Sequence, residues 1–272
     1  MSLVQIPGGQ LEYNVAGTGR PACLTHQYTG VATSGPLADM LTPHVTLYAI
    51  NARGIGESGP VRDTADLEMN GLADDLEAAR QALALPAWVV VGASTGGMVA
   101  LSYAVRHPAG LAGLILVGTG ASHRFVQGSI YDPEHPRAEM QRAYQALASG
   151  TPEGAAEYRR TVWSLSVHDP DTPRPAGMRS AFSMERFRAF ANEMPRFDLE
   201  EAITQIRVPT LVIVGRHDPQ APLENSRRIA AAIPGARLVI CEHSGHFPYV
   251  EEPAIFQSAI DQFMRESGLA HT

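Results

Sequence analysis

The sequence predicts an α/β fold with a mostly parallel, doubly wound sheet of eight strands and an inserted helical cap. Short apolar runs of strand character recur along the chain, and amphipathic helical patterns separate most of them. This alternation is typical of parallel strands joined by helical crossovers. One stretch, residues 119–198, breaks the alternation because it contains helical patterns and proline clusters but no convincing strand pattern.

The predicted strands are short, as buried strands of a central sheet are. The Pro7–Gly9 segment is a short connection between two early strands, so we expect the sheet to begin with an antiparallel pair. The apolar runs that follow it are Leu11–Val15, Ala22–Thr25, Val45–Ile50, Trp88–Val91, Leu114–Val117, Thr210–Val214 and Leu238–Ile240. The helical patterns between and after them are Asn70–Leu85, Thr95–His107, Leu223–Ile233 and Pro253–Glu266.

The interrupting stretch is predicted to be a helical insertion. Proline cannot continue a helix and restricts the residue before it, so the proline clusters mark the ends of its helices. An insertion at the carboxyl end of a strand is well placed to cover a ligand. We therefore predict a core of residues 1–118 and 199–272 and a cap of residues 119–198. The predicted cap helices are Ala138–Ser149, Glu153–Leu165 and Met178–Glu193, and the prolines are Pro133, Pro136, Pro170, Pro173 and Pro175.

Composition excludes several function classes. The chain of 272 residues has a net charge of −7, which argues against binding nucleic acid or an anionic membrane, because both need clustered positive charge. It contains no lysine, which excludes Schiff-base and Ser–Lys mechanisms. Cys23 and Cys241 lie in apolar runs and are expected to be buried thiols. With no signal-peptide pattern and no run near ~20 apolar residues, we expect a cytoplasmic monomer or homodimer.

The strongest functional pattern is Gly-x-Ser-x-Gly, formed by residues 92–96 with Ser94 at its centre. A β-branched run precedes the pattern and a helical pattern follows it. A serine on such a strained strand–turn–helix junction exposes its hydroxyl, and small flanking residues let strand and helix approach. We predict that Ser94 is the nucleophile of an acyl-transfer enzyme.

The general base is predicted to be His246. It lies in the loop between the last predicted strand and the final helix, which can reach across to Ser94. His243 is the competing histidine, but it lies closer to the strand and lacks a preceding glycine. A serine hydroxyl is a poor nucleophile unless an adjacent base accepts its proton.

The third member is predicted to be Asp218, which follows the Thr210–Val214 run after a glycine turn. Its carboxylate would hold His246 in the correct tautomer and stabilise the imidazolium. The order Ser94, Asp218, His246 matches the order expected for a nucleophile on this type of junction.

The oxyanion hole is predicted from two backbone N–H groups. One belongs to Thr95, at the start of the helix that follows Ser94, where N–H groups have no partner within the helix. The other belongs to Tyr28, with Gln27 as the alternative, in the loop after the Ala22–Thr25 strand.

These motifs resemble the α/β-hydrolase superfamily over nearly the whole chain. The segment Asn51–Ser58 resembles its Asp-x-Arg-Gly-x-Gly-x-Ser loop, with Asn51 replacing the aspartate. Residues 26–30 depart from its common His-Gly-x-x-Gly loop. The chain is similar to capped serine esterases and proline-iminopeptidase-like hydrolases, although it lacks the His-Gly-Gly-Pro-Gly loop of the latter. The resemblance implies a helical cap, no cofactor and no metal.

The predicted function is hydrolysis of a small-molecule carboxylic ester or lactone. The alternatives are an N-acyl-homoserine lactonase, an aminopeptidase of the proline-iminopeptidase kind, a non-catalytic receptor, and a cofactor-free lyase or perhydrolase. Aromatic residues of the predicted cap are candidate pocket walls and favour an apolar acyl group, although their helical spacing also fits a core. They are Tyr131, Tyr144, Tyr158, Trp163, Phe182, Phe187 and Phe190.

Overall fold

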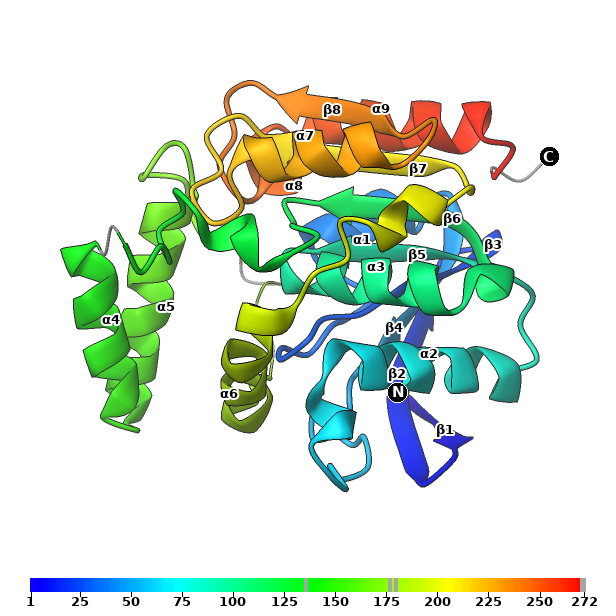
Figure 1. The fold of residues 1–272 in the computed structure, drawn as a ribbon, viewed down its shortest axis with the longest axis horizontal. Helices are drawn as coiled ribbons and strands as arrows, with labels where there is room; N and C mark the ends of the chain where they lie inside the picture. Colours follow the sequence, from blue (N-terminus) through cyan, green and yellow to red (C-terminus); the bar gives the residue numbers. More distant parts are fainter. Residues whose placement is uncertain (135–136, 176–177, 179–180, 270–272) are drawn as a thin grey trace.

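The centre of the computed structural model is one eight-stranded sheet (Figure 1). The structure describes residues 1–134, 137–175, 178 and 181–269. The strand order is β1-β2-β4-β3-β5-β6-β7-β8; β1 and β2 pair antiparallel, as do β2 and β4, and all other neighbours are parallel. The predicted sheet and its antiparallel start are therefore confirmed. The strands are β1 Ser2–Ile6, β2 Gly9–Ala16, β3 Arg20–Leu24, β4 Val45–Ile50, β5 Trp88–Ala93, β6 Leu111–Val117, β7 Thr210–Gly215 and β8 Arg237–Cys241.

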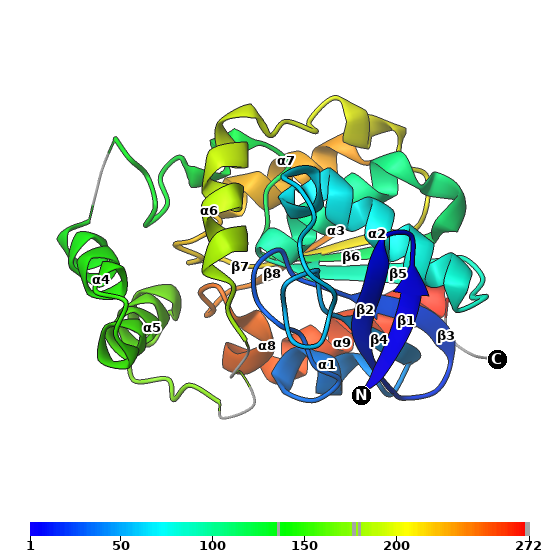
Figure 2. The same cartoon turned by 90° about the horizontal axis from the view of Figure 1, so that it is seen from below.

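Helices cover both faces of the sheet (Figure 2). One face carries α2 Met69–Ala82, α3 Thr95–Arg106 and α7 Leu223–Ala232, and the other carries α1 Pro36–Leu41, α8 Pro248–Glu251 and α9 Pro253–Glu266. The short helices α1 and α8 were not predicted. In α9, Phe256, Ile260 and Phe263 recur at helical spacing and are buried on the sheet.

The central strands are apolar on both faces because helices shield both sides of a parallel sheet. Val89, Val90 and Val91 of β5 have no exposed surface.

Cys23 and Cys241 are buried free thiols, as predicted, and burial raises the pKa of both. None of the helices in the described part of the chain has the length and apolar character needed to cross a membrane.

Between β6 and β7, in the stretch predicted as the cap, the described residues form the α-helices α4 Ala138–Ala148, α5 Pro152–Ser166 and α6 Met184–Glu193. Helices α4 and α5 pack side by side at one end of the molecule, away from the sheet, whereas α6 lies against the core in both views (Figures 1 and 2). Short 3-10 turns occur at Ala65–Leu67, Pro108–Gly110, His123–Val126, Met194–Arg196 and Ala202–Gln205. The division of the chain into core and cap stays a prediction.

The predicted helix Met178–Glu193 begins later than expected. Ser183 caps α6, since its hydroxyl accepts the Arg186 N–H, and Phe182 is extended and forms a β-bridge with Thr29. The helical pattern therefore starts only after this bridge. Residues 179–180 of the predicted helix, and Pro136, lie outside the described residues.

Helix α6 is anchored to the core by Arg186, which is fully buried. Its guanidinium donates to the carbonyl oxygens of Gln27 (2.6 Å), Asp66 (3.0 Å) and Arg53 (3.3 Å). Burial lowers the pKa of Arg186 to about 10, so the group stays charged at neutral pH. One cation therefore joins two connections of the core, β3–α1 and β4–α2, to the inserted segment.

Replacing Arg186 by methionine is expected to lower the free energy of unfolding by ~3 kcal/mol, because the variant leaves buried carbonyl groups without a charged donor. Unfolding in urea, followed by circular dichroism, measures this change. Arg188→Met is the matched control, since Arg188 lies on the same helix but is exposed. Equal stability of the two variants would contradict the anchoring role.

Candidate active site

Ser94 lies at the sharp turn between β5 and α3. Its backbone angles, φ 54° and ψ −127°, are strained for a residue with a side chain. The surrounding structure holds them in place: the Ser94 N–H donates to the Val117 carbonyl (2.9 Å), and the Thr119 hydroxyl donates to the Ser94 carbonyl (2.7 Å). Strain held by neighbouring strands in this way exposes the side chain at the end of the sheet.

The glycines on either side of Ser94 are needed because of close backbone contacts. A Cβ atom on Gly92 would lie 2.2 Å from the carbonyl oxygen of Gly96. A Cβ atom on Gly96 would lie 2.4 Å from the carbonyl oxygen of Thr25. The Gly-x-Ser-x-Gly spacing therefore has a steric cause in this chain, as the sequence analysis expected.

His246 and Asp218 form a buried pair. The loops after β8 and β7 bring them together, with His246 Nδ1 lying 3.0 and 2.9 Å from the two carboxylate oxygens of Asp218. The same carboxylate accepts the backbone N–H groups of Gln220 (2.8 Å) and Ala221 (2.9 Å). Because an ionised carboxylate only accepts, Nδ1 carries the proton and Nε2 is left as the acceptor. His243, the competing histidine, is exposed.

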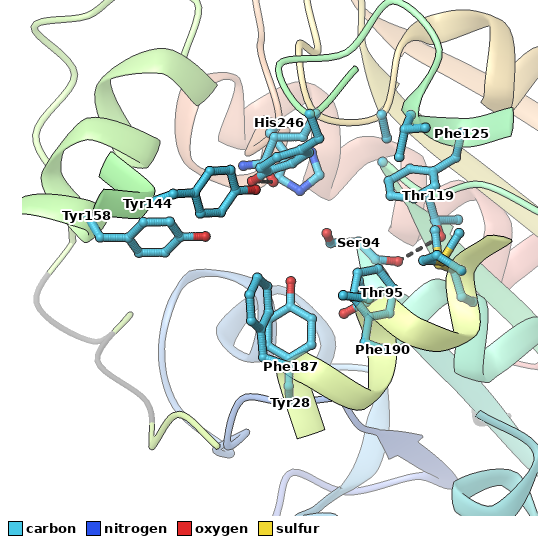
Figure 3. A pocket seen from close by; sticks show the side chains of 18 residues that line it. Tyr28, Ser94, Thr95, Thr119, Phe125, Tyr144, Tyr158, Phe187, Phe190 and His246 are labelled. Atoms are coloured by element: carbon cyan, nitrogen blue, oxygen red, sulfur yellow. Dashed lines mark hydrogen bonds between the residues drawn. The ribbon is translucent and has the colours of Figure 1, made fainter. Parts of the chain in front are cut away.

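Ser94 and His246 line the same cavity, which has a volume of about 190 Å³. Figure 3 shows the Ser94 hydroxyl and the His246 ring both bordering it. Both residues are described, and no hydrogen bond joins the Ser94 hydroxyl to His246 in this state. Catalytic hydrogen bonds are often long in the absence of substrate and shorten when it binds.

The inserted helices contact the loops that carry the pair. The carbonyl of Ser166, at the end of α5, accepts the His246 N–H (2.7 Å), and its hydroxyl accepts the Gln220 side-chain amide (2.6 Å). The Gln220 amide oxygen in turn accepts the hydroxyl of Tyr131 (2.9 Å). These bonds fix the loop of His246 relative to the insertion.

Gly118 leaves room for the histidine–aspartate pair. Its φ is +49°, and a Cβ atom there would lie 2.8 Å from an Asp218 carboxylate oxygen and 3.2 Å from His246 Nδ1. Gly118→Ala is expected to lower kcat/KM for an ester on the order of 100-fold, because displacing catalytic groups by about 1 Å has that cost. Gly128→Ala is the control: its φ is +73°, but nothing lies within 4 Å of the added atom. Similar activity in both variants would contradict the steric argument.

Thr95 is the first residue of α3, so its N–H has no partner within the helix. The predicted second donor, the Tyr28 N–H, points toward His26 Nδ1 at 3.4 Å, and the Thr29 N–H lies 3.3 Å from the same atom. Burial and the nearby His246 lower the pKa of His26 to about 3, so His26 stays neutral. Since Nδ1 accepts, Nε2 carries the proton and donates to the Thr95 hydroxyl at 3.1 Å.

Gln27, the alternative in the oxyanion prediction, directs its side chain away from the cavity. The side-chain amide of Gln27 donates to the backbone carbonyl of Leu67 (2.6 Å). The backbone carbonyl of Gln27 accepts from the Arg186 guanidinium (2.6 Å). Arg186 therefore fixes the peptide plane between Gln27 and Tyr28. Local sequence patterns could not predict the contact between Arg186 and Gln27, because the two residues are 159 positions apart. His26 bonds to residues two and three positions away, and only its place in the loop that replaces His-Gly-x-x-Gly could have indicated it.

The cavity walls are largely aromatic. Five of the seven predicted aromatic residues line it, and for Trp163 and Phe182 the expectation is wrong. Trp163 stacks on Phe247 with ring centres 4.7 Å apart, and Phe182 is exposed beside Tyr28. Several lining residues were not predicted, because they are not aromatic residues of the predicted cap helices and no local motif marks them. They are Met98, Thr119, Phe125, Val126, Ala191, Met194, Gln220 and Ala221.

Residues 23–253 match the pattern of the family described as alpha/beta hydrolase fold. The chain belongs to this family. Among the described residues, no group of three or more histidine, cysteine, aspartate or glutamate side chains is arranged to hold a metal ion.

Several known proteins match nearly the whole length of this chain at low sequence identity. A solved alpha/beta fold family hydrolase from Bacillus anthracis is 28% identical with a TM-score of 0.86, covering 96% of this chain and 98% of its own. The chain is 26% identical to a proline iminopeptidase, PfmaB, of Pestalotiopsis fici, over 93% of this chain and 95% of the relative. It is 28% identical to a pimeloyl-[acyl-carrier protein] methyl ester esterase of Xanthomonas oryzae, over 93% of this chain and 98% of the relative. Other matches are putative carbamate hydrolases.

Proposed function

We propose that this chain is a serine hydrolase of small carboxylic esters or lactones. The observation that carries the proposal is the strained Ser94, which lines a cavity that it shares with His246, whose Nδ1 is bonded to Asp218. Strained backbone of this kind is retained where it serves function. The family and its ester-hydrolase relatives support hydrolysis as the class of reaction.

The proposed reaction is acyl transfer in two steps. His246 Nε2 takes the Ser94 proton as the serine oxygen attacks the carbonyl carbon, and the oxyanion accepts the N–H groups of Thr95 and Tyr28. The Tyr28 N–H, which lies 3.4 Å from His26 Nδ1 in this structure, turns from that atom to the oxyanion when substrate binds. The protonated histidine then donates to the departing alcohol, leaving an acyl-enzyme. Water, activated by the same histidine, releases the acid and restores Ser94. Asp218 stabilises the imidazolium formed in both steps.

The cavity favours an ester over a peptide with a free amino terminus. An aminopeptidase has to hold a cationic amine, and a carboxylate is the group that recognises it. The described residues lining the cavity include no aspartate and no glutamate. The similarity to a proline iminopeptidase nevertheless makes that activity the second candidate. A lactone ring opens by the same acyl-transfer chemistry and remains part of the proposal.

A panel of substrates tests the proposal: p-nitrophenyl esters of increasing acyl length, N-acyl-homoserine lactones, an aryl carbamate and a proline arylamide. We expect turnover of short or aryl esters, with a sharp upper limit of acyl size set by the small cavity. Turnover of the proline arylamide alone would replace the proposal by the aminopeptidase. Labelling of Ser94 by a fluorophosphonate without turnover of any substrate would point to the receptor alternative.

A further inference from the structure

The two sides of the active-site cavity differ in chemistry. One side is largely apolar, chiefly Phe125, Phe187 and Phe190, and Figure 3 shows the hydroxyl of Tyr28 beside Phe187 on it. The opposite side carries Tyr144 of α4 and Tyr158 of α5, and Figure 3 shows both hydroxyl oxygens directed into the cavity toward Ser94 and His246. A phenol at the far end of a hydrophobic cavity adds a polar contact at a fixed distance from the reacting serine.

These two hydroxyl groups are available to a ligand. Tyr131, which also lines the cavity, already donates to Gln220 at 2.9 Å. Tyr144 and Tyr158 pack against each other, with ring centres 5.9 Å apart, but within the described part of the chain neither hydroxyl makes a hydrogen bond. Burial raises the pKa of both groups, so both are protonated donors at neutral pH. Tyr144 is 39% exposed and Tyr158 is half-buried, so a ligand can reach both hydroxyl groups, and a ligand acceptor there gains a hydrogen bond that no protein group supplies.

Charge limits the kind of acceptor. The described residues lining the cavity include no arginine, and the chain has no lysine, so a substrate carboxylate at this end would lie in an apolar site without a counter-charge. A carbonyl, ether or hydroxyl oxygen meets no such penalty. Size limits it further: about 190 Å³ is slightly larger than a cavity of ~150 Å³ that holds one benzene ring.

We propose, building on the ester hydrolase proposed above, that the substrate's acyl part is a compact apolar group, the size of one ring, with a neutral oxygen acceptor at its far end. Tyr144 and Tyr158 donate to this acceptor, and the phenylalanine side holds the ring. The acceptor thereby fixes how deeply the acyl group enters. The carbonyl carbon then lies beside Ser94.

The test compares methyl 4-acetylbenzoate with methyl 4-isopropylbenzoate, which has a similar shape but no acceptor. The ratio of their kcat/KM values is the readout, because the difference in intrinsic reactivity is the same for every variant. Tyr144→Phe and Tyr158→Phe are each expected to lower this ratio about fivefold, the usual effect of losing one neutral hydrogen bond. Tyr131→Phe is the control and keeps the ratio, because its hydroxyl is already bonded within the protein. The monoanion of monomethyl terephthalate is expected to react at least ten times more slowly than the acetyl ester.

An unchanged ratio in both phenylalanine variants, or faster reaction of the terephthalate, would overturn the proposal. A binding measurement separates it from the proposed catalysis. Ser94→Ala is titrated with N-methyl-4-acetylbenzamide and its 4-isopropyl counterpart by calorimetry. Preference for the acetyl amide that Tyr144→Phe and Tyr158→Phe abolish supports the acceptor site even if no ester is hydrolysed. Absence of any preference overturns the acceptor site even if esters are hydrolysed.

Discussion

Ser94→Ala is expected to abolish ester hydrolysis, lowering kcat by a factor on the order of 10⁶, the scale known for loss of a nucleophilic serine. The reason is local: alanine keeps the backbone and the cavity but removes the only atom proposed to bond the acyl group. The histidine–aspartate pair lies on other loops and keeps its hydrogen bonds. Steady-state rates with the best ester of the panel, together with loss of fluorophosphonate labelling, measure the effect.

Ser102→Ala is the matched control for this variant. Ser102 is a buried serine on the same helix α3, and it does not line the cavity. Its hydroxyl has no hydrogen-bond partner among the described residues, so its loss is expected to leave activity and stability close to those of the parent protein. Retained turnover in Ser94→Ala would remove the acyl-enzyme from the mechanism.

The sequence was most informative where one local rule determines structure. The apolar run before Ser94 and the glycines around it predicted a strand, a tight turn and a helix, because the steric need for Gly92 and Gly96 is visible within five residues. The same alternation of patterns predicted parallel strands, and β5, β6, β7 and β8 pair parallel with their neighbours. The fold was therefore accessible from sequence patterns alone.

Contacts between distant segments could not be predicted in this way. The bridge between Thr29 and Phe182 shortens the predicted third cap helix, although the residues around Phe182 have no strand signal of their own. The bond from Arg186 to the Gln27 carbonyl joins residues 159 positions apart. Such pairings are set by tertiary packing, which overrides local propensity.

The composition of the cavity shows the same limit. Aromatic residues at helical spacing occur both in cores and in ligand sites, and the sequence pattern is the same for the two. The Trp163 ring stacks on Phe247, and its indole N–H donates to the Thr172 carbonyl. Tyr158, five residues earlier on the same helix, lines the cavity instead. Only the direction in which α5 packs separates these two roles.

Asp218→Asn is expected to lower kcat by a factor on the order of 10⁴ while leaving KM much less changed. The carboxylate accepts the proton-bearing Nδ1 of His246 and the N–H groups of Gln220 and Ala221. An asparagine amide presents its oxygen to the two backbone donors and its NH₂ group to the histidine. His246 then has to accept at Nδ1 and carry its proton on Nε2, where it cannot take a proton from Ser94.

A second histidine–aspartate pair in this chain provides the control. His44 Nε2 lies 2.7 Å from an Asp261 carboxylate oxygen, between the loop before β4 and helix α9. Neither residue lines the cavity. Asp261→Asn removes the same kind of contact and is expected to keep full activity, so the comparison separates catalytic loss from the general loss of a histidine–carboxylate pair. If Asp218→Asn hydrolysed esters at the parent rate, His246 would have to be oriented by the Ser166 carbonyl and the packed loop alone.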